Sequence, residues 1–166
     1  MRHGMEAHRR NRPYCMGSLP WQLNDSWPVV SWSAIDYYGN WKAMQYQTQR
    51  AFAPVLINAI REGDKLRVYV LSDCLKTEKV TLQLEWTDFQ GKVHRRQQVD
   101  GNLPVNASKV LYEEDWQKAF AACDTTASFL RMTLKGHQSR KILSDEVYYP
   151  VYPKYLSLIH ISEPTR

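Results

Sequence analysis

The sequence predicts a mixed α and β protein in two parts, with the boundary near Pro54. Before this residue, apolar side chains recur at helical spacing on either side of one short apolar stretch. From Val55 onward the apolar period changes from about 3.6 to about 2 residues, which is typical of half-buried strands. The sequence therefore predicts helices and one strand in residues 1–54 and an antiparallel β-sandwich in residues 55–155.

The first expected element is a helix over residues 4–11, which are rich in helix formers and end before Pro13. Proline in a helix interior breaks the helix, so the helix is expected to stop there. A mostly apolar run over residues 14–23 predicts a strand buried on both faces, as in parallel sheets. Pro20 cannot donate a ladder hydrogen bond, so the strand is expected to end near it.

A second helix is expected after Gly39, with Asn40 as its N-cap and Pro54 beyond its end. Its apolar stripe is expected to face the core and consists of Trp41, Met44, Thr48 and Phe52. The order helix, strand, loop, helix is the repeating unit of an α/β barrel. The first part of the chain is therefore expected to resemble a piece of such a barrel.

Three later runs alternate between apolar and polar residues, which predicts strands with one buried face. The residues expected to face inward are Leu66, Val68 and Val70; Val80, Leu82, Leu84 and Trp86; and Leu130, Met132 and Leu134. Turns are expected where Gly, Asp and Asn cluster, at residues 62–64, 88–91 and 100–102. Residues 113–122 are expected to form a short helix or a loop. Short alternating strands separated by such turns indicate a β-sandwich.

Composition is typical of a folded globular protein. The apolar fraction is 43% and the charged fraction 23%, and no apolar run reaches the ~20 residues of a membrane span. The formal net charge is +5, but the basic residues lie in short groups separated by acidic residues. They accompany no zinc-finger spacing and no ribonucleoprotein motif. We therefore expect neither a membrane nor a nucleic acid as a partner.

The cysteines and histidines predict no bound metal. The three cysteines are widely spaced, at Cys15, Cys74 and Cys123. An odd number excludes a fully paired disulfide framework within the chain, so buried free thiols are expected. The histidines fit neither an HExxH pattern nor a CxxC partner. No metal and no other cofactor is expected.

Residues 17–42, GSLPWQLNDSWPVVSWSAIDYYGNWK, contain four of the six tryptophans. This run closely resembles the end of the catalytic barrel in glycoside hydrolase family 2 β-mannosidases, in which the strand carries the same Trp-Gln-Leu-Asn-Asp segment. The resemblance continues through residues 50–54, where that family passes into an immunoglobulin-like domain. It implies that residues 1–54 are the C-terminal end of a TIM-barrel catalytic domain and that residues 55–155 are an immunoglobulin-like β-sandwich.

Length limits how much of such an enzyme the chain can hold. A (β/α)₈ barrel alone needs roughly 200 residues, and the chain has 166. The rest of the barrel is expected in a missing N-terminal part of the same polypeptide. Residues 144–149 resemble the stretch before the family's closing strand, so the sandwich is expected to lack its last strand.

The last residues are expected to be foreign to the fold. Residues 156–166, LSLIHISEPTR, resemble the in-frame translation of a sequencing adapter and are expected to be an artefact, with an amphipathic tail as the alternative. Nothing before His8 resembles a signal peptide. The sequence leaves the compartment open, and a periplasmic or secreted parent is compatible with it.

The resemblance places Trp21 at the mouth of the barrel, where the family's matching tryptophan lines the sugar subsite at which the bond is cut. An indole face offers an apolar platform to a pyranose, and the alternative is a core tryptophan that plugs the barrel. Asn24 and Asp25 are expected to fix the loop by hydrogen bonds to the backbone, and either is a candidate to contact a sugar hydroxyl. The predicted substrate-binding residues are therefore Trp21, Asn24 and Asp25.

The stretch between the predicted strand and the second helix contains four more aromatic residues. They are Trp27, Trp32, Tyr37 and Tyr38. They are expected to cover the barrel edge, with a sugar-stacking rim as the alternative.

The resemblance implies a retaining exo-glycosidase that hydrolyses terminal β-mannosides, with β-mannoside oligosaccharides as substrates. Retention requires two carboxyl groups about 5–5.5 Å apart. Residues 1–54 contain three carboxylates, Glu6, Asp25 and Asp36, and only Asp25 is near the predicted strand end. We therefore expect no catalytic residue in this chain. The alternatives are a non-catalytic carbohydrate-binding or structural β-sandwich module, or another family 2 glycosidase such as a β-galactosidase.

Overall fold

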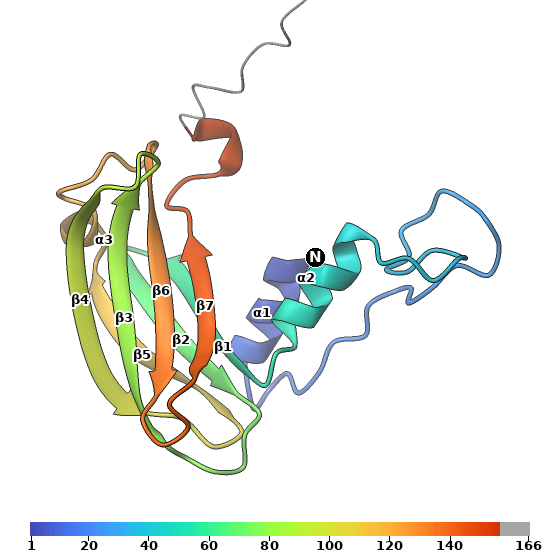
Figure 1. Ribbon diagram of the computed structural model, residues 1–166, viewed down its shortest axis with the longest axis horizontal. Helices are drawn as coiled ribbons and strands as arrows, with labels where there is room; N and C mark the ends of the chain where they lie inside the picture. Colours follow the sequence, from blue (N-terminus) through green and yellow to red (C-terminus); the bar gives the residue numbers. More distant parts are fainter. Residues whose placement is uncertain (157–166) are drawn as a thin grey trace, which may run out of the picture. The chain divides into compact units, whose positions relative to one another are not determined.

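The structure is a computed structural model in which residues 1–156 are described (Figure 1). The chain divides into two compact units. One consists of Met1–Leu56, Val70–Thr77 and Pro104–Lys109, and the other of Ile57–Tyr69, Glu78–Leu103 and the chain from Val110 onward. The adapter-like segment, residues 156–166, lies outside the described residues except for Leu156.

Two helices lie in the first unit, α1 (Arg2–Arg10) and α2 (Ala43–Ala51). The prediction of a helix that ends before Pro13 is confirmed by α1. Buried Arg9 donates from Nη1 to the carbonyl oxygens of Ala51 at 2.6 Å and Ala53 at 2.8 Å. The Arg9 guanidinium therefore satisfies carbonyl groups at the end of α2 that have no partner within that helix. None of the described helices is long and apolar enough to cross a membrane.

The start and the buried face of α2 differ from the prediction. The helix begins after Lys42, and Asn40 does not cap it, because the Asn40 amide donates to the carboxylate of Asp36 at 2.9 Å. The predicted core stripe was also wrong. Trp41 and Phe52 are exposed and the other two members are half-buried, whereas Ala51 is the residue that α2 buries.

The strand predicted over residues 14–23 does not form. The region has no regular strand, and the nearest pairing is an isolated parallel bridge between Asn24 and Ile35. A strand buried on both faces needs hydrogen-bonded neighbours along its length, and in the described part of the chain only Gln22 and Leu23, at the end of this run, accept backbone hydrogen bonds from another segment, residues 34–35. Leu19, in the middle of it, is 100% exposed. No barrel is evident in the described residues.

Within residues 1–156, seven strands make up two antiparallel layers, and the sequence predicted such a sandwich. They are β1 (Val55–Glu62), β2 (Lys65–Ser72), β3 (Lys79–Asp88), β4 (Val93–Asn102), β5 (Ala107–Asp115), β6 (Ser128–Gly136) and β7 (Ile142–Tyr148). One sheet has the order β1-β2-β5 and the other β4-β3-β6-β7, and the two face each other in Figure 1. The Trp86 ring of β3 meets the Tyr112 ring of β5 edge to face, at 6.5 Å between centroids. The β-sandwich prediction is confirmed.

The core of the sandwich follows the predicted alternation. All ten residues expected to face inward are at most 1% exposed. Full burial of one such aliphatic side chain contributes about 1.5–3 kcal/mol. Apolar burial between the two sheets is therefore the main source of stability in this part of the chain.

Two of the three predicted turns are present, and the third was wrong. Gly63 and Gly91 have φ values of 59° and 87° and close the turns after β1 and β3. Asp100, Gly101 and Asn102 instead lie in β4 and pair with the start of β3. A Cβ atom at Gly101 would lie 2.3 Å from Cδ1 of Leu111, so the glycine serves close packing and not a turn.

The C-terminal third differs from the prediction at its last strand. Residues 113–122 include the end of β5 and the short helix α3 (Trp116–Ala119), capped by Asp115, whose carboxylate accepts from the Lys118 amide at 3.1 Å. Residues 144–148, expected to precede the closing strand, lie in β7 and pair with β6. That a further closing strand is missing stays a prediction. Seven strands in layers of three and four equal the number in a constant-type immunoglobulin sandwich. The charged pair Asp145 and Glu146 weakened the alternation that would have revealed β7. The 3-10 helix η1 (Pro153–Tyr155) follows.

Candidate functional site

The candidate site lies in the aromatic loop, which we define as residues 17–42. Its backbone folds so that residues 22–25, 34–36 and 40–42 lie side by side. The Ala34 amide donates to the Gln22 carbonyl at 3.0 Å, and the Ile35 amide to the Leu23 carbonyl at 2.9 Å. The Lys42 amide in turn donates to the Ala34 carbonyl at 2.9 Å. Residues 34–36 are therefore held between the other two segments.

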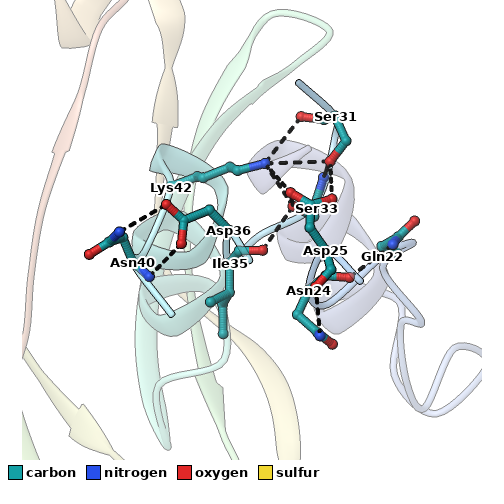
Figure 2. A network of polar contacts seen from close by, with 9 residues as sticks. All are labelled: Gln22, Asn24, Asp25, Ser31, Ser33, Ile35, Asp36, Asn40 and Lys42. Atoms are coloured by element: carbon teal, nitrogen blue, oxygen red, sulfur yellow. Dashed lines mark hydrogen bonds and ion pairs between the residues drawn. The ribbon is translucent and has the colours of Figure 1, made fainter. Parts of the chain in front are cut away.

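A buried polar cluster holds the same segments through side chains (Figure 2). Asp25 is only 5% exposed. Its Oδ1 accepts a hydrogen bond from Ser31 Oγ at 2.5 Å. Its Oδ2 accepts from Ser33 Oγ and from Lys42 Nζ, both at 2.8 Å. We name these four residues the Asp25 cluster.

The charge of Lys42 dominates the electrostatics of this cluster. The hydrogen bond from its ammonium lowers the pKa of Asp25 from 3.8 to about 2, and the hydroxyl of Ser31 contributes in the same direction. The carboxylate is therefore ionised at every pH at which proteins are ordinarily handled. A buried charge is tolerated when it is paired and hydrogen-bonded, and Asp25 meets both conditions.

A second, more exposed turn closes the loop before α2. The Asn40 amide nitrogens donate to the two carboxylate oxygens of Asp36, the backbone N–H at 2.8 Å and the side-chain Nδ2 at 2.9 Å. The side-chain hydrogen bond from Asn40 is the largest cause of a lowered pKa for Asp36. Gly39, with a φ of 85°, permits the turn between them.

The aromatic side chains of the loop, in contrast, point to solvent. Those with more than a third of their surface exposed are Trp21, Trp27, Trp32, Tyr37, Tyr38 and Trp41. The rings of Tyr37 and Tyr38 meet edge to face with centroids 5.2 Å apart. Their exposure makes these side chains the candidate contact residues of the loop.

The three predicted substrate-binding residues have different surroundings. Trp21 is 74% exposed, so in the described chain it is not the buried plug that was the alternative. Asn24 is exposed, and its Nδ2 donates to the Asp25 carbonyl at 3.3 Å. Asp25 fixes the loop, as favoured from the sequence, although its partners are side chains and not the backbone. Contact between any of the three and a sugar remains a prediction.

Sequence reasoning missed the partners of Asp25, which are Ser31, Ser33 and Lys42. One signal was available, because Lys42 is the only lysine or arginine in residues 13–49 and Asp25 is one of two carboxylates there. The only cation in a largely apolar stretch is expected to pair with one of the few anions there. The two serines carried no comparable signal.

Residues 1–54 contain no pair of carboxylates suited to glycoside hydrolysis, and the described residues contain no group suited to a metal. The three carboxylates of residues 1–54 have separate local partners, Glu6 with Arg2, Asp25 with Lys42 and Asp36 with Asn40. Within residues 1–156, no three His, Cys, Asp or Glu side chains are grouped so that they could hold a metal ion. The three cysteines are free thiols, as predicted, but they are half-buried and not buried as expected.

Comparison with known proteins identifies the family. The family model described as "Mannosidase Ig/CBM-like domain" matches residues 64–155. The chain belongs to this family. The resemblance to β-mannosidases seen in the sequence is confirmed at the level of this mannosidase Ig/CBM-like domain.

The matches extend beyond the domain. A β-mannosidase A of Aspergillus fumigatus is 35% identical over 157 residues, which covers 86% of this chain and 17% of that protein. The crystal structure of a β-D-mannosidase from Dictyoglomus thermophilum matches 95% of this chain and 19% of that one, with 31% identity and a TM-score of 0.82. An exo-chitosanase of Amycolatopsis orientalis covers 89% of this chain and 18% of that one at 21% identity and a TM-score of 0.71, which shows the shared fold alone. The chain spans about a sixth of the length of the curated relatives it matches.

Proposed function

We propose that this chain is the C-terminal part of a retaining exo-glycosidase that hydrolyses terminal β-mannosides in oligosaccharide degradation. One observation carries the proposal. The Aspergillus fumigatus match covers 86% of the chain, whereas the domain accounts for residues 64–155 only. The similarity to β-mannosidases must therefore include a large part of residues 1–63, with α2 and much of the aromatic loop. A sandwich module used on its own has no reason to share that segment with these enzymes.

The two parts of the chain have different roles in this proposal. Residues 1–54 are the end of the catalytic TIM barrel, whose other strands and both catalytic glutamates lie in the N-terminal part of the full-length polypeptide. Residues 55–155 are a non-catalytic sandwich. The run over residues 14–23 finds the neighbouring strands that it lacks here in the remainder of the barrel. This accounts for an apolar run that is exposed in the described chain.

Trp21 is the residue we assign to substrate contact. Its indole is largely exposed, and the backbone that follows it is fixed by hydrogen bonds from residues 34–35. An exposed aromatic plate on a fixed backbone suits stacking against the apolar face of a sugar ring. Asn24, exposed beside it, is a candidate for a hydroxyl contact, whereas both carboxylate oxygens of Asp25 already accept hydrogen bonds within the loop.

Two alternatives predict different results. A non-catalytic carbohydrate-binding module is favoured by the exposed aromatic side chains, and it requires no catalytic barrel in the same polypeptide. Another family 2 glycosidase, such as a β-galactosidase, requires the barrel but differs in the preferred sugar.

The experiment is to extend the reading frame upstream and express the full-length polypeptide and the 166-residue chain in parallel. Both are assayed with aryl β-mannoside, β-galactoside, β-glucoside and β-glucosaminide. We expect hydrolysis of the β-mannoside by the full-length polypeptide and none above background by the chain, which lacks the paired carboxylates that retention requires. The proposal would be contradicted if the 166-residue chain hydrolysed a substrate and a single substitution at Asp25 abolished that hydrolysis. A preference for the β-galactoside would favour the second alternative.

A further inference from the structure

The Asp25 cluster is more tightly built than a surface loop requires. The side chain of Asp25 is 2% exposed and that of Lys42 29%, and their charged atoms are 2.8 Å apart. Lys42 Nζ also donates to Ser33 Oγ at 2.8 Å, and Ser33 is itself buried. Burial of an ion pair is costly unless its geometry is fixed by further hydrogen bonds, and the serine hydroxyls supply them.

The cluster is connected to Trp21 through the backbone. Gln22 directly follows Trp21, and its carbonyl accepts from the amide of Ala34, the neighbour of Ser33. Lys42 binds Ala34 through the backbone and Asp25 through its ammonium. A change in either charged side chain therefore displaces the segment that holds the residue next to Trp21.

The indole itself cannot supply this positioning. A side chain that is 74% exposed is not fixed by packing, so the direction of Trp21 depends on its backbone. The backbone of residues 22–25 is in turn fixed by the Asp25 cluster and by the hydrogen bonds to residues 34–35. We therefore expect the buried polar atoms of the Asp25 cluster to determine the position of the exposed Trp21 indole.

We propose that Asp25 and Lys42 are positioning residues for Trp21, which hold the indole where a sugar ring can stack on it. The contact with sugar rests on the function proposed above, whereas the mechanical role does not. Loss of the ion pair is expected to move the Trp21 indole away from the position in which a sugar ring can stack on it. Displacement by about 1 Å of a group that positions substrate costs on the order of 100-fold in rate.

The first test uses the 166-residue chain and hydrogen exchange. Asp25→Asn and Lys42→Met should each raise the amide exchange rates of residues 22–25 and 34–36 by about tenfold or more, because the buried partner loses its counter-charge. Lys42→Arg should restore part of the protection. The matched control is Asp145→Asn, which removes a carboxylate paired with Arg131 at 3.0 Å on the sandwich. It should leave exchange in the loop unchanged, and unchanged exchange in the Asp25→Asn and Lys42→Met chains would overturn the inference.

The second test is a double-mutant cycle in the full-length polypeptide, with kcat and KM measured for an aryl β-mannoside. Asp25→Asn should lower kcat/KM by roughly 10-fold to 100-fold when Trp21 is present and have little further effect after Trp21→Ala. A residue that matters only for general stability gives additive effects, and additivity overturns the inference while leaving the proposed function intact. Full activity of Trp21→Ala instead counts against the proposed role of Trp21 in substrate binding.

Discussion

The sandwich and the aromatic loop bury opposite kinds of side chain. In the sandwich, aliphatic residues and Trp86 fill the space between the sheets, and charged residues such as Arg67 and Glu113 pair on the outside at 2.6 Å. In the loop, an ion pair and two serine hydroxyls are inside and the tryptophans are outside. A loop that buries an ion pair and exposes its aromatic rings is a candidate to contact another part of the polypeptide or a ligand.

The difference follows from where each region finds its partners. Each strand of the sandwich has a neighbour within the described chain, so its apolar face is covered by the opposite sheet. The loop is ordered mainly by polar contacts, those between residues 22–25, 31–36 and 42 and those between Asp36 and Asn40. Hydrogen bonds and paired charges can fix a loop without a core, provided that each buried polar atom is satisfied.

The largest expected effect of a single substitution belongs to Trp21. In the full-length polypeptide, Trp21→Ala should lower kcat/KM by roughly ten-fold to a thousand-fold, in line with the loss of a few kcal/mol of transition-state binding. The melting temperature should change little, because the side chain buries little surface here. Steady-state kinetics and thermal unfolding of the same preparation check both statements. If Trp21→Ala has normal kinetics and a strongly lowered melting temperature, Trp21 is a core residue that fills the barrel and not a substrate contact.

The next largest effect is on the free energy of unfolding, which should depend on the sandwich far more than on the loop. Leu82→Ala removes a side chain with no exposed surface in β3 and should reduce the free energy of unfolding by about 2–5 kcal/mol. Leu19→Ala, at the fully exposed position of the loop, should change it by less than about 0.5 kcal/mol. Urea unfolding of the 166-residue chain, followed by far-ultraviolet circular dichroism, measures both. Equal costs would mean that the loop has an apolar core of its own.

Sequence patterns predicted the sandwich well because the alternation of apolar and polar residues along one strand directly determines which side chains face the core. Every residue from Leu66 to Leu134 that was expected inside is inside. The misses are places where a specific contact, which the pattern does not encode, decides the conformation. Gly101 resembled a turn residue but gives space to Leu111, and the amide of Asn40, expected to cap α2, is taken by Asp36.

The candidate site was less predictable for the same reason. Trp21, Asn24 and Asp25 could be identified from their resemblance to a family, but what holds them could not. Ser31, Ser33 and Lys42 contact Asp25 from six, eight and seventeen positions away, a spacing that no helix or strand period marks. The strand over residues 14–23 does not form because the described chain offers a hydrogen-bonded neighbour only to its last two residues.

A smaller effect concerns how the chain behaves in solution. The exposed tryptophans of the loop should make the 166-residue chain self-associate, and the double substitution Trp27→Ser and Trp32→Ser should reduce this association. Limited proteolysis should cut first before Pro54 and leave the sandwich, where backbone hydrogen bonds and burial are dense. Size exclusion and mass spectrometry of the fragments measure both properties. A monodisperse monomer that resists cleavage before Pro54 would show that the loop is already fully partnered.

The smallest effect is the response of the loop to acid, and it separates the buried ion pair from the surface pairs of the sandwich. A carboxyl group whose pKa falls on folding adds stability above its unfolded value and loses it as the pH drops through its folded value. For Asp25 these values are 3.8 and about 2, so its contribution should persist to about pH 4 and disappear towards pH 2. Hydrogen exchange of residues 22–25, measured between pH 5 and pH 2 and corrected for intrinsic exchange, follows this change. In the Asp25→Asn chain the same residues should exchange quickly throughout, with no transition in that range. A transition that survives Asp25→Asn would assign the acid response to another carboxylate, with Asp36 the first to test because its pKa is also lowered.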